Sequence, residues 1–216
     1  MSHTMHHGAH TSAGRVIRWA RLYDFGTRFF GLGQGRHRLT LDLAAVAPGE
    51  RVLDVGCGPG SLALLAKERV GPEGEVCGID AGAEMIRLAR EKARKAGADI
   101  QFEVGLIEEI PFPDGTFDVV LSTLMLHHLP DDLKRRGFRE IARVLKPAGR
   151  LLAADLAPTG PFSIMRLLIR AFGHGLPKTY INDLVTMLRE AGFSADVLDA
   201  GRKPLAFIRA VPATTR

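Results

Sequence analysis

The sequence predicts a doubly wound α/β fold, in which helices cover both faces of a mostly parallel β-sheet. Short apolar runs typical of buried strands alternate with segments of helical periodicity, which is the pattern of a parallel sheet. The 216 residues, 46% of them hydrophobic, are enough for one full core. We therefore expect a single domain of this fold with an N-terminal helical cap.

The first 46 residues predict a tail followed by this cap. Four of the eight histidines lie in the opening stretch MSHTMHHGAH, which has no apolar periodicity, so residues 1–14 are expected to form a disordered tail with no part in the mechanism. Residues 15–46 are amphipathic and helical in pattern, with an interruption at GLGQG (31–35). Pro48 and Gly49 then separate the cap from the first strand.

The main domain is expected over residues 47–216, with a lid-like insertion at about 157–180. Ligands of doubly wound sheets bind at the carboxyl ends of the strands, where the 56–60 loop, Asp80 and the stretch from Ser122 fall. Strands are predicted over 52–55, 75–80, 100–105, 117–123 and 149–156, and helices over 61–70, 83–97 and 131–145.

The three glycines of RVLDVGCGPG predict a loop that a ligand approaches closely. Gly56, Gly58 and Gly60 can adopt backbone angles that side chains forbid. Their spacing is not the G-x-G-x-x-G that places a helix N-terminus against a pyrophosphate, because Ser61 stands where the third glycine would be. Asp80 ends the next strand, and its two carboxylate oxygens can accept both hydroxyls of a ribose. The loop and the acid together predict a nucleoside ligand.

Charge, hydropathy and cysteine content narrow the class of protein. The net charge of +5 lies on two flanking segments, with +4 on residues 1–46 and +3 on residues 161–180, whereas residues 47–160 carry −3. No apolar stretch is long enough to span a membrane and no signal-peptide pattern is present, so a cytoplasmic protein is expected. Cys57 and Cys77 fit reduced thiols. No carboxylate and histidine cluster has ligand spacing, so no metal is expected.

Four ordered motifs together resemble the class I S-adenosylmethionine-dependent methyltransferases. They are VLDVGCGPG with Asp80, PFPDGTFDVV (111–120), LHHLPD (126–131) and EIARVLKPAGRLL (140–152). The resemblance covers about residues 20–156 and is greatest to the branch of the ubiquinone/menaquinone C-methyltransferases and the bacterial phosphatidylethanolamine N-methyltransferases. It implies a Rossmann-like sheet of seven strands with the last one antiparallel, and it assigns VTMLREAGF (185–193) and PLAFIRAV (204–211) to the last helix and strand.

The resemblance implies S-adenosyl-L-methionine as the cofactor and S-adenosyl-L-homocysteine as the product. The glycine loop would pass beside the methionine part of a cofactor that has no phosphate, and Asp54 would orient its ammonium group. Asp80 would take the ribose hydroxyls, with a helix N-cap as the alternative, and Met85 would pack on the adenine, with ordinary core packing as the alternative. The predicted cofactor residues are Tyr23, Asp54, Gly56, Cys57, Gly58, Gly60, Asp80, Ala81, Met85, Leu106, Ile107, Ser122 and Leu124.

One position departs from the family pattern. Many relatives have Gly-Asp-Ala after the third strand, where the acid accepts a hydrogen bond from the adenine amino group, but this chain has Gly105-Leu106-Ile107. Backbone groups of Leu106 and Ile107 can still read the adenine edge. We expect weaker or less selective cofactor binding, because this side-chain contact is absent or rerouted.

Methyl transfer needs in-line positioning and, where the nucleophile carries a proton, a base. His127 of LHHLPD is the predicted proton acceptor and Tyr23 its partner, since phosphoethanolamine methyltransferases resemble this chain in having a tyrosine and histidine pair at these places. Quinone methyltransferases of similar pattern have an arginine instead of His127. The alternative is that His127 and His128 only satisfy local backbone groups.

The segment GPFSIMRLLIRAFGHGL (160–176) is apolar, with Arg166 and Arg170 one helical turn apart. It fits a lid over a hydrophobic substrate, a peripheral membrane contact or a homodimer contact. Together with the basic cap it predicts a small or lipid-like substrate with an anionic group, such as a phospholipid headgroup or a quinone precursor, bound by these two arginines.

Three other classes of protein were weighed. A non-catalytic S-adenosylmethionine-binding or assembly protein would share every cofactor motif and stays open as the alternative. A nicotinamide-dependent reductase needs the other glycine spacing and a Tyr-x-x-x-Lys pair, which the chain lacks. No nucleic acid partner is expected, because the Asn/Asp-Pro-Pro-aromatic motif for a flipped base is replaced by Ser122-Thr123-Leu124-Met125.

Overall fold

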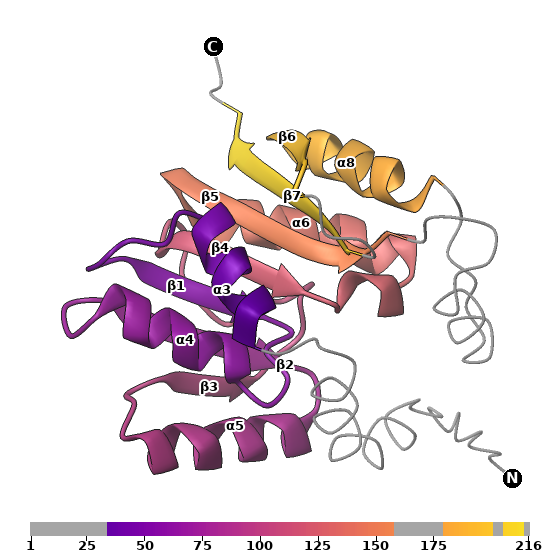
Figure 1. Cartoon of the computed structure of the whole chain (residues 1–216). Coiled ribbons are helices and arrows are strands. Elements are labelled where there is room, and N and C mark those ends of the chain that lie inside the picture. Colours follow the sequence, from indigo (N-terminus) through magenta and orange to yellow (C-terminus); the bar gives the residue numbers. More distant parts are fainter. Residues whose placement is uncertain (1–33, 158–178, 201–204, 214–216) are drawn as a thin grey trace, which may run out of the picture.

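The computed structural model describes residues 34–157, 179–200 and 205–213. They form one seven-stranded sheet in the order β3-β2-β1-β4-β5-β7-β6 (Figure 1). The first five strands of the chain are parallel, and β7 is antiparallel to both of its neighbours, which confirms the predicted fold class. The strands are β1 (Arg51–Val55), β2 (Glu75–Asp80), β3 (Gln101–Val104), β4 (Phe117–Thr123), β5 (Leu145–Leu156), β6 (Phe193–Leu198) and β7 (Leu205–Pro212).

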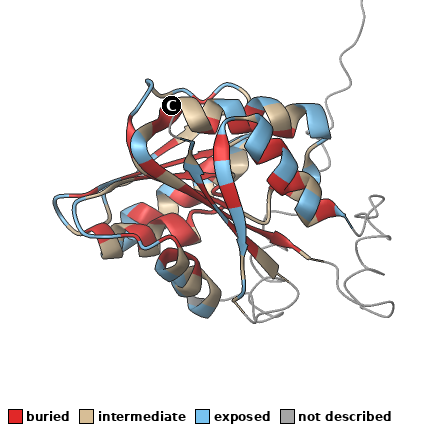
Figure 2. Ribbon diagram, turned by 90° about the horizontal axis from the view of Figure 1, so that it is seen from above, coloured by how far each residue is buried: buried red, intermediate tan, exposed pale blue. Residues whose placement is uncertain are grey.

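Helices cover both faces of this sheet, and each face has its own hydrophobic core (Figure 1). Figure 2 shows the buried residues along the central strands and on the inner sides of the helices. Because side chains alternate along a strand, Val52 of β1 packs in one core and Leu53 and Val55 pack in the other. Helices α3 (Gln34–Leu43), α4 (Ser61–Val70) and α5 (Ala83–Ala96) cover the face of Val52, and α6 (Asp131–Val144) and α8 (Tyr180–Glu190) cover the opposite face.

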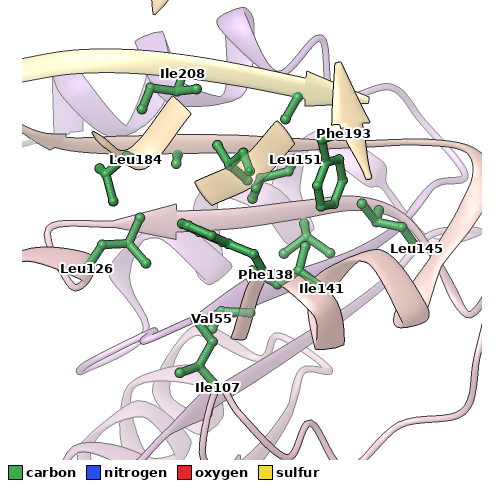
Figure 3. Close-up of a cluster of buried hydrophobic side chains, with 14 of the residues drawn as sticks. Val55, Ile107, Leu126, Phe138, Ile141, Leu145, Leu151, Leu184, Phe193 and Ile208 are labelled. Atoms are coloured by element: carbon green, nitrogen blue, oxygen red, sulfur yellow. The ribbon is translucent and has the colours of Figure 1, made fainter. Parts of the chain in front are cut away.

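Figure 3 shows the core beneath α6 and α8, in which side chains far apart in sequence meet. Phe138 and Ile141 of α6 pack with Leu151 of β5 and Leu184 of α8, and all four side chains are fully buried. Leu126, in the short 3-10 helix η1 (Leu126–His128), belongs to the same core. The first side chain of η1 therefore anchors this short helix to the hydrophobic core.

Several predicted boundaries coincide with the structure and a few do not. The predictions for 61–70, 75–80 and 117–123 match α4, β2 and β4. Strand β5 begins at Leu145 rather than at 149, so it includes Pro147 and Gly149. Pro147 fits within the strand because β7 pairs β5 only from Leu151 onward, so its missing N–H interrupts no bond to β7.

The C-terminal prediction was wrong in detail. The helix expected over 185–193 is α8, which begins at Tyr180 and ends at Glu190. Gly192 then adopts a φ of +90°, which reverses the chain, and β6 follows as a strand that the residue pattern did not predict. At the other end, α3 begins at Gln34, so the last two residues of the interruption expected over 31–35 are helical, and the first three lie outside the described residues.

The strand order places a topological switch point between β1 and β4. The chain moves outward from β1 to β3 and then returns to pair β4 with β1, so the loops after β1 and β4 diverge and leave room for a ligand at this edge of the sheet. Tyr23, Arg166, Arg170 and most of the expected lid lie outside the described residues. Within the described ranges, no helix has the length and apolar character needed to cross a membrane.

Candidate active site

The glycine loop between β1 and α4 is held against the end of β2. The backbone N–H groups of Gly56 and Cys57 both donate to the carbonyl oxygen of Ile79, at 2.8 and 2.9 Å. All three loop glycines have positive φ, namely +73° at Gly56, +51° at Gly58 and +76° at Gly60. This conformation favours glycine over every other residue, so the backbone requires the pattern that the sequence displays.

The three glycines are nevertheless needed for different reasons. A Cβ at Gly60 would lie 2.8 Å from the ring of Phe102, and one at Gly56 would lie 2.5 Å from the side chain of Met125. A Cβ at Gly58 would have no described atom within 4 Å. The protein's own packing therefore excludes side chains at two positions, and Gly58 is the loop glycine whose open side can face a ligand. This refines the expectation that all three serve the cofactor directly.

Asp80, at the end of β2, joins the glycine loop to α5. Its Oδ2 accepts a hydrogen bond from the N–H of Gly58 at 2.9 Å, and its Oδ1 accepts one from Gly82 at 2.8 Å. Burial raises the pKa of Asp80, and these two backbone bonds partly offset the rise. The helix N-cap alternative for Asp80 is wrong, because Gly82 is the N-cap residue of α5 and Asp80 lies two residues before it. A carboxylate has further lone pairs, so Asp80 can still accept ribose hydroxyls.

The carboxyl group of Asp54 is buried in the site without a hydrogen-bond partner among the described residues. Asp54 lies on β1 and is 1% exposed. Burial first, and the charge of Asp80 second, raise its pKa to about 7. A buried acceptor pair without a donor fits a cationic ligand group, as an ammonium group would supply.

Together, the unsatisfied Asp54 and the open side of Gly58 match the needs of S-adenosylmethionine. Asp54 can hold the ammonium group, Gly58 leaves space for the methionine part and Asp80 can hold the ribose. The residues present therefore fit this cofactor. Gly58 and Asp80 are in direct contact, whereas Asp54 and Asp80 lie near the carboxyl ends of adjacent strands.

The other predicted cofactor residues lie around the same edge of the sheet. Met85 is half-buried and belongs to neither core, which favours the adenine-packing expectation over ordinary core packing. Leu106 is 47% exposed, while the side chain of Ile107 is buried against Gly137 of α6. Ala81 is exposed, and the Cys57 thiol is buried in the core beneath α4, where burial holds its pKa far above the usual range.

The end of β4 is strained and carries a second orphaned polar group. The Ser122 hydroxyl is buried and has no partner within the described residues. Leu124 adopts a φ of +53°, rare for a side-chain-bearing residue, and its N–H donates to the carbonyl of Ala154 at 2.8 Å. This turn directs the chain from β4 into η1 and hence sets the position of His127.

His127 is held by a carboxylate from the neighbouring strand. Its ring Nδ1 lies 2.6 Å from Oδ1 of Asp155 in β5, and its backbone N–H donates to Oδ2 of the same group at 3.0 Å. The side chain of His127 is 14% exposed and that of Asp155 is 1% exposed. The ring thus does more than satisfy local backbone groups, while the neighbouring His128 is exposed.

Two members of this cluster were missed in the sequence. Asp155 also accepts bonds from the Tyr180 hydroxyl at 3.2 Å and from the Leu156 N–H at 2.7 Å. Burial and the neighbouring Asp155 hold the pKa of Tyr180 far above its usual range, so it stays a hydroxyl donor. The sequence signal for Asp155 was its place near the end of the apolar run LLAADL, because an aspartate buried in such a run is almost always paired with another group.

The fold and the site define a class I methyltransferase architecture with a nucleoside-binding edge. A family profile described as "Methyltransferase domain" matches residues 52–149. The chain belongs to the S-adenosylmethionine-dependent methyltransferases, so the family and the cofactor predicted from the motifs are confirmed.

Individual relatives support this assignment. The chain is 39% identical over 168 residues to an arsenite methyltransferase of Halobacterium salinarum, covering 76% of this chain but only 42% of that protein. It is 33% identical over 178 residues to a demethylmenaquinone methyltransferase of Listeria welshimeri, covering 72% of this chain and 75% of the relative. A crystal structure of a methyltransferase from Aquifex aeolicus superposes with a TM-score of 0.66 at 25% identity, over 81% of this chain and 88% of that one.

Proposed function

We propose that this methyltransferase transfers a methyl group from S-adenosylmethionine to a small, lipid-like molecule with an anionic group, such as a phospholipid headgroup or a quinone precursor. The observation that carries the proposal is the ring of His127, which follows β4 at the ligand-binding edge of the sheet. Its Nδ1 contacts Asp155, and its Nε2 has no partner in the described part of the chain. A ring nitrogen in this state can take a proton from a nucleophile.

Methyl transfer depends mainly on the alignment of the substrate with the methyl group and on a base, because the cofactor already activates the methyl group. S-adenosylmethionine, when bound, supplies a methyl group on a positively charged sulfur, which is a good leaving group. A substrate ammonium group or acidic carbon must lose a proton before its electrons can attack the methyl group, and a hydroxyl must lose its proton as the new bond forms. His127 would accept that proton at Nε2. Tyr23 is proposed to assist His127, although it lies outside the described residues.

The choice of a lipid-like anionic substrate has two supports. One relative that covers most of this chain is named for demethylmenaquinone. The basic charge of the sequence lies on residues 1–46 and 161–180, which flank the acidic centre, and the second of these segments is largely apolar. We propose that Arg166 and Arg170 of this segment bind the anionic group.

Arsenite is a poor fit as the substrate, although one relative is named for it. Soft ions of this kind are bound by thiolates, and the chain has two cysteines. Cys57 and Cys77 pack in different cores, on opposite faces of the sheet. Burial raises the pKa of Cys77 to about 11 and that of Cys57 further still, so both remain neutral thiols.

The proposal is tested by assaying methyl transfer to two probes: a short-chain prenylated demethylquinol and phosphatidylethanolamine vesicles. We expect product from at least one probe, a loss of about 100-fold or more in His127→Asn, as for removal of a general base, and a raised KM in Arg166→Gln with Arg170→Gln. Arg139→Gln, an exposed arginine of α6, is the matched control. Binding of S-adenosylhomocysteine without turnover of either probe would contradict the proposal and favour the non-catalytic alternative.

A further inference from the structure

We propose that Asp155 is a positioning residue for methyl transfer, which fixes His127 in the one tautomer that leaves Nε2 able to accept a proton. The proposal rests on the function proposed above, because it assigns to Asp155 control over the base that His127 supplies. It concerns a residue that no motif of the sequence pointed to. Hydrogen bonds from three residues converge on the Asp155 carboxylate.

The first step concerns the proton between the two side chains. An ionised carboxylate only accepts hydrogen bonds, so at 2.6 Å from Oδ1 of Asp155 the Nδ1 of His127 must carry its hydrogen. A neutral imidazole has one N–H, and the other nitrogen is then an acceptor. The contact therefore selects the tautomer in which Nε2 has a lone pair.

The second step concerns how firmly Asp155 is itself held. Its carboxylate accepts four hydrogen bonds: from His127 Nδ1, the His127 N–H, the Leu156 N–H and the Tyr180 hydroxyl. Two of these donors are backbone groups, and the carboxylate is 1% exposed. Asp155 thus has little freedom to rotate, and it fixes both the ring of His127 and the backbone of η1.

The third step follows the proton and the electrons. The lone pair or carbanion electrons of the nucleophile form the bond to the methyl carbon while the carbon–sulfur bond breaks, and the electron pair of that bond stays on sulfur. The proton of the nucleophile passes to Nε2, which makes His127 an imidazolium. The Asp155 carboxylate lies against this new charge at Nδ1, and it stabilises the charge until the proton is released to water.

The test uses Asp155→Asn, which keeps the shape of the side chain. Its amide can turn an NH₂ group toward Nδ1, which moves the imidazole hydrogen to Nε2 and blocks proton transfer. We expect the ¹⁵N spectrum of the ligand-free protein, recorded at a pH where the imidazole is neutral, to show a protonated Nδ1 and an unprotonated Nε2 for His127. In the variant we expect an unprotonated Nδ1 and a protonated Nε2. His127→Asn identifies the signals among the eight histidines.

Activity is the second readout of the same variant. On whichever of the two probes is methylated, kcat should fall by about 100-fold or more, as for loss of a general base, while KM and S-adenosylhomocysteine affinity change little. Asp118→Asn is the matched control, since Asp118 is a bonded aspartate of β4 that contacts Lys146 and the Arg51 N–H instead. It should keep both the His127 tautomer and kcat.

The outcomes separate this proposal from the proposed function. A wild-type protein with the hydrogen on Nε2, an unchanged tautomer in Asp155→Asn, or full activity in that variant would each overturn the role of Asp155. A wild-type protein that methylates neither probe contradicts the substrate proposal, and the spectra alone still test whether Asp155 sets the tautomer. Reversal of the tautomer together with loss of kcat supports the proposal.

Discussion

Oδ2 of Asp80 accepts a hydrogen bond from the N–H of Gly58 at 2.9 Å, so the residue that we expect to bind the ribose also shapes the loop beside it. Its other oxygen holds Gly82 ahead of α5. One carboxylate at the end of β2 thereby links the loop after β1 to the residue that precedes α5. Replacing it should alter the loop as well as the cofactor contact.

We expect Asp80→Ala to abolish measurable binding of S-adenosylhomocysteine, and Asp80→Asn to weaken it by tenfold or more. The asparagine keeps one acceptor oxygen, so it cannot hold Gly58, Gly82 and two ribose hydroxyls together. Titration calorimetry measures both affinities. Asp196→Ala, at an exposed position on β6, should bind as the wild type does. Tight binding by Asp80→Ala would remove Asp80 from the cofactor site.

The buried carboxyl of Asp54 should make stability depend on pH. Its folded-state pKa is raised from 3.8 to about 7, so between these values the folded protein keeps a proton that the unfolded chain has released. Its contribution to stability is therefore lost as pH rises from about 4 to about 7. Asp54→Asn should stabilise the ligand-free protein at pH 8 by up to about 4 kcal/mol, and by much less at pH 5. An equal change in melting temperature at both pH values would argue against this.

Cofactor binding should release a proton at low pH through the same group. An ammonium group beside Asp54 favours the ionised carboxylate, so binding at pH 6 requires the proton to leave. Affinity for S-adenosylhomocysteine should fall below about pH 7, by at most about tenfold per pH unit. Calorimetry at pH 6 in two buffers of different ionisation enthalpy measures the proton count. Asp54→Asn should release none from this site, and equal release in both proteins would exclude Asp54.

Alanine at the loop glycines should separate packing from binding. Gly60→Ala places Cβ 2.8 Å from Phe102 and 3.0 Å from Ala89 at positive φ, so it should destabilise the fold by about 2 kcal/mol or more. Gly58→Ala meets no described atom within 4 Å and should cost only the left-handed backbone term, about 1 kcal/mol, yet lose cofactor affinity.

The control for this pair is Gly115→Ala. Gly115 has a φ of +59° and the same open surroundings, but it lies in the loop before β4. It should match Gly58→Ala in melting temperature and the wild type in affinity for S-adenosylhomocysteine. If Gly58→Ala binds normally as well, the open side of Gly58 does not face the cofactor.

Gly137 of α6 should resist a substitution that helix propensity favours. A Cβ there would lie 2.5 Å from Cγ1 of Ile107, so Gly137→Ala should destabilise the protein despite the gain of about 1 kcal/mol for alanine over glycine in a helix. The displaced Ile107 would also disturb the loop after β3. Adding Ile107→Val should restore part of the melting temperature. Independent, additive effects in this double-mutant cycle would contradict the contact.

Much of the fold could be predicted because local pattern and tertiary role agree. The run EVCGID is apolar and bounded by glycines on its N-terminal side and by an acid at its end, and β2 spans those residues. Asp54, Gly58 and Asp80 could be found because each lies near the carboxyl end of a strand or in the loop that follows it, where the chain order already fixes the edge of the sheet. Strand β6 was missed although buried Phe193 and Ala195 alternate with exposed Ser194 and Asp196, because the expected helix was extended to residue 193.

The support for His127 could not be predicted in this way. Asp155 lies 28 residues from His127 and Tyr180 lies 25 residues beyond Asp155, on helix α8, which covers the same face of the sheet as α6. Their meeting depends on the register of β4 with β5, in which Thr123 pairs with Ala154. A single sequence has no local pattern that encodes that register, so the polar cluster became visible only in three dimensions.

The strained backbone at Leu124 lowers the stability of the protein while it fixes the turn after β4. A leucine in the left-handed region costs about 1–2 kcal/mol relative to an ordinary conformation, and here it is kept by a bond to Ala154 of the adjacent strand. Glycine at this position would relieve the strain, and it would also let the turn between β4 and η1 adopt other conformations. Directed evolution for thermal tolerance would therefore be drawn to this position, and screens that select for heat resistance alone would recover sturdier proteins that methylate less well.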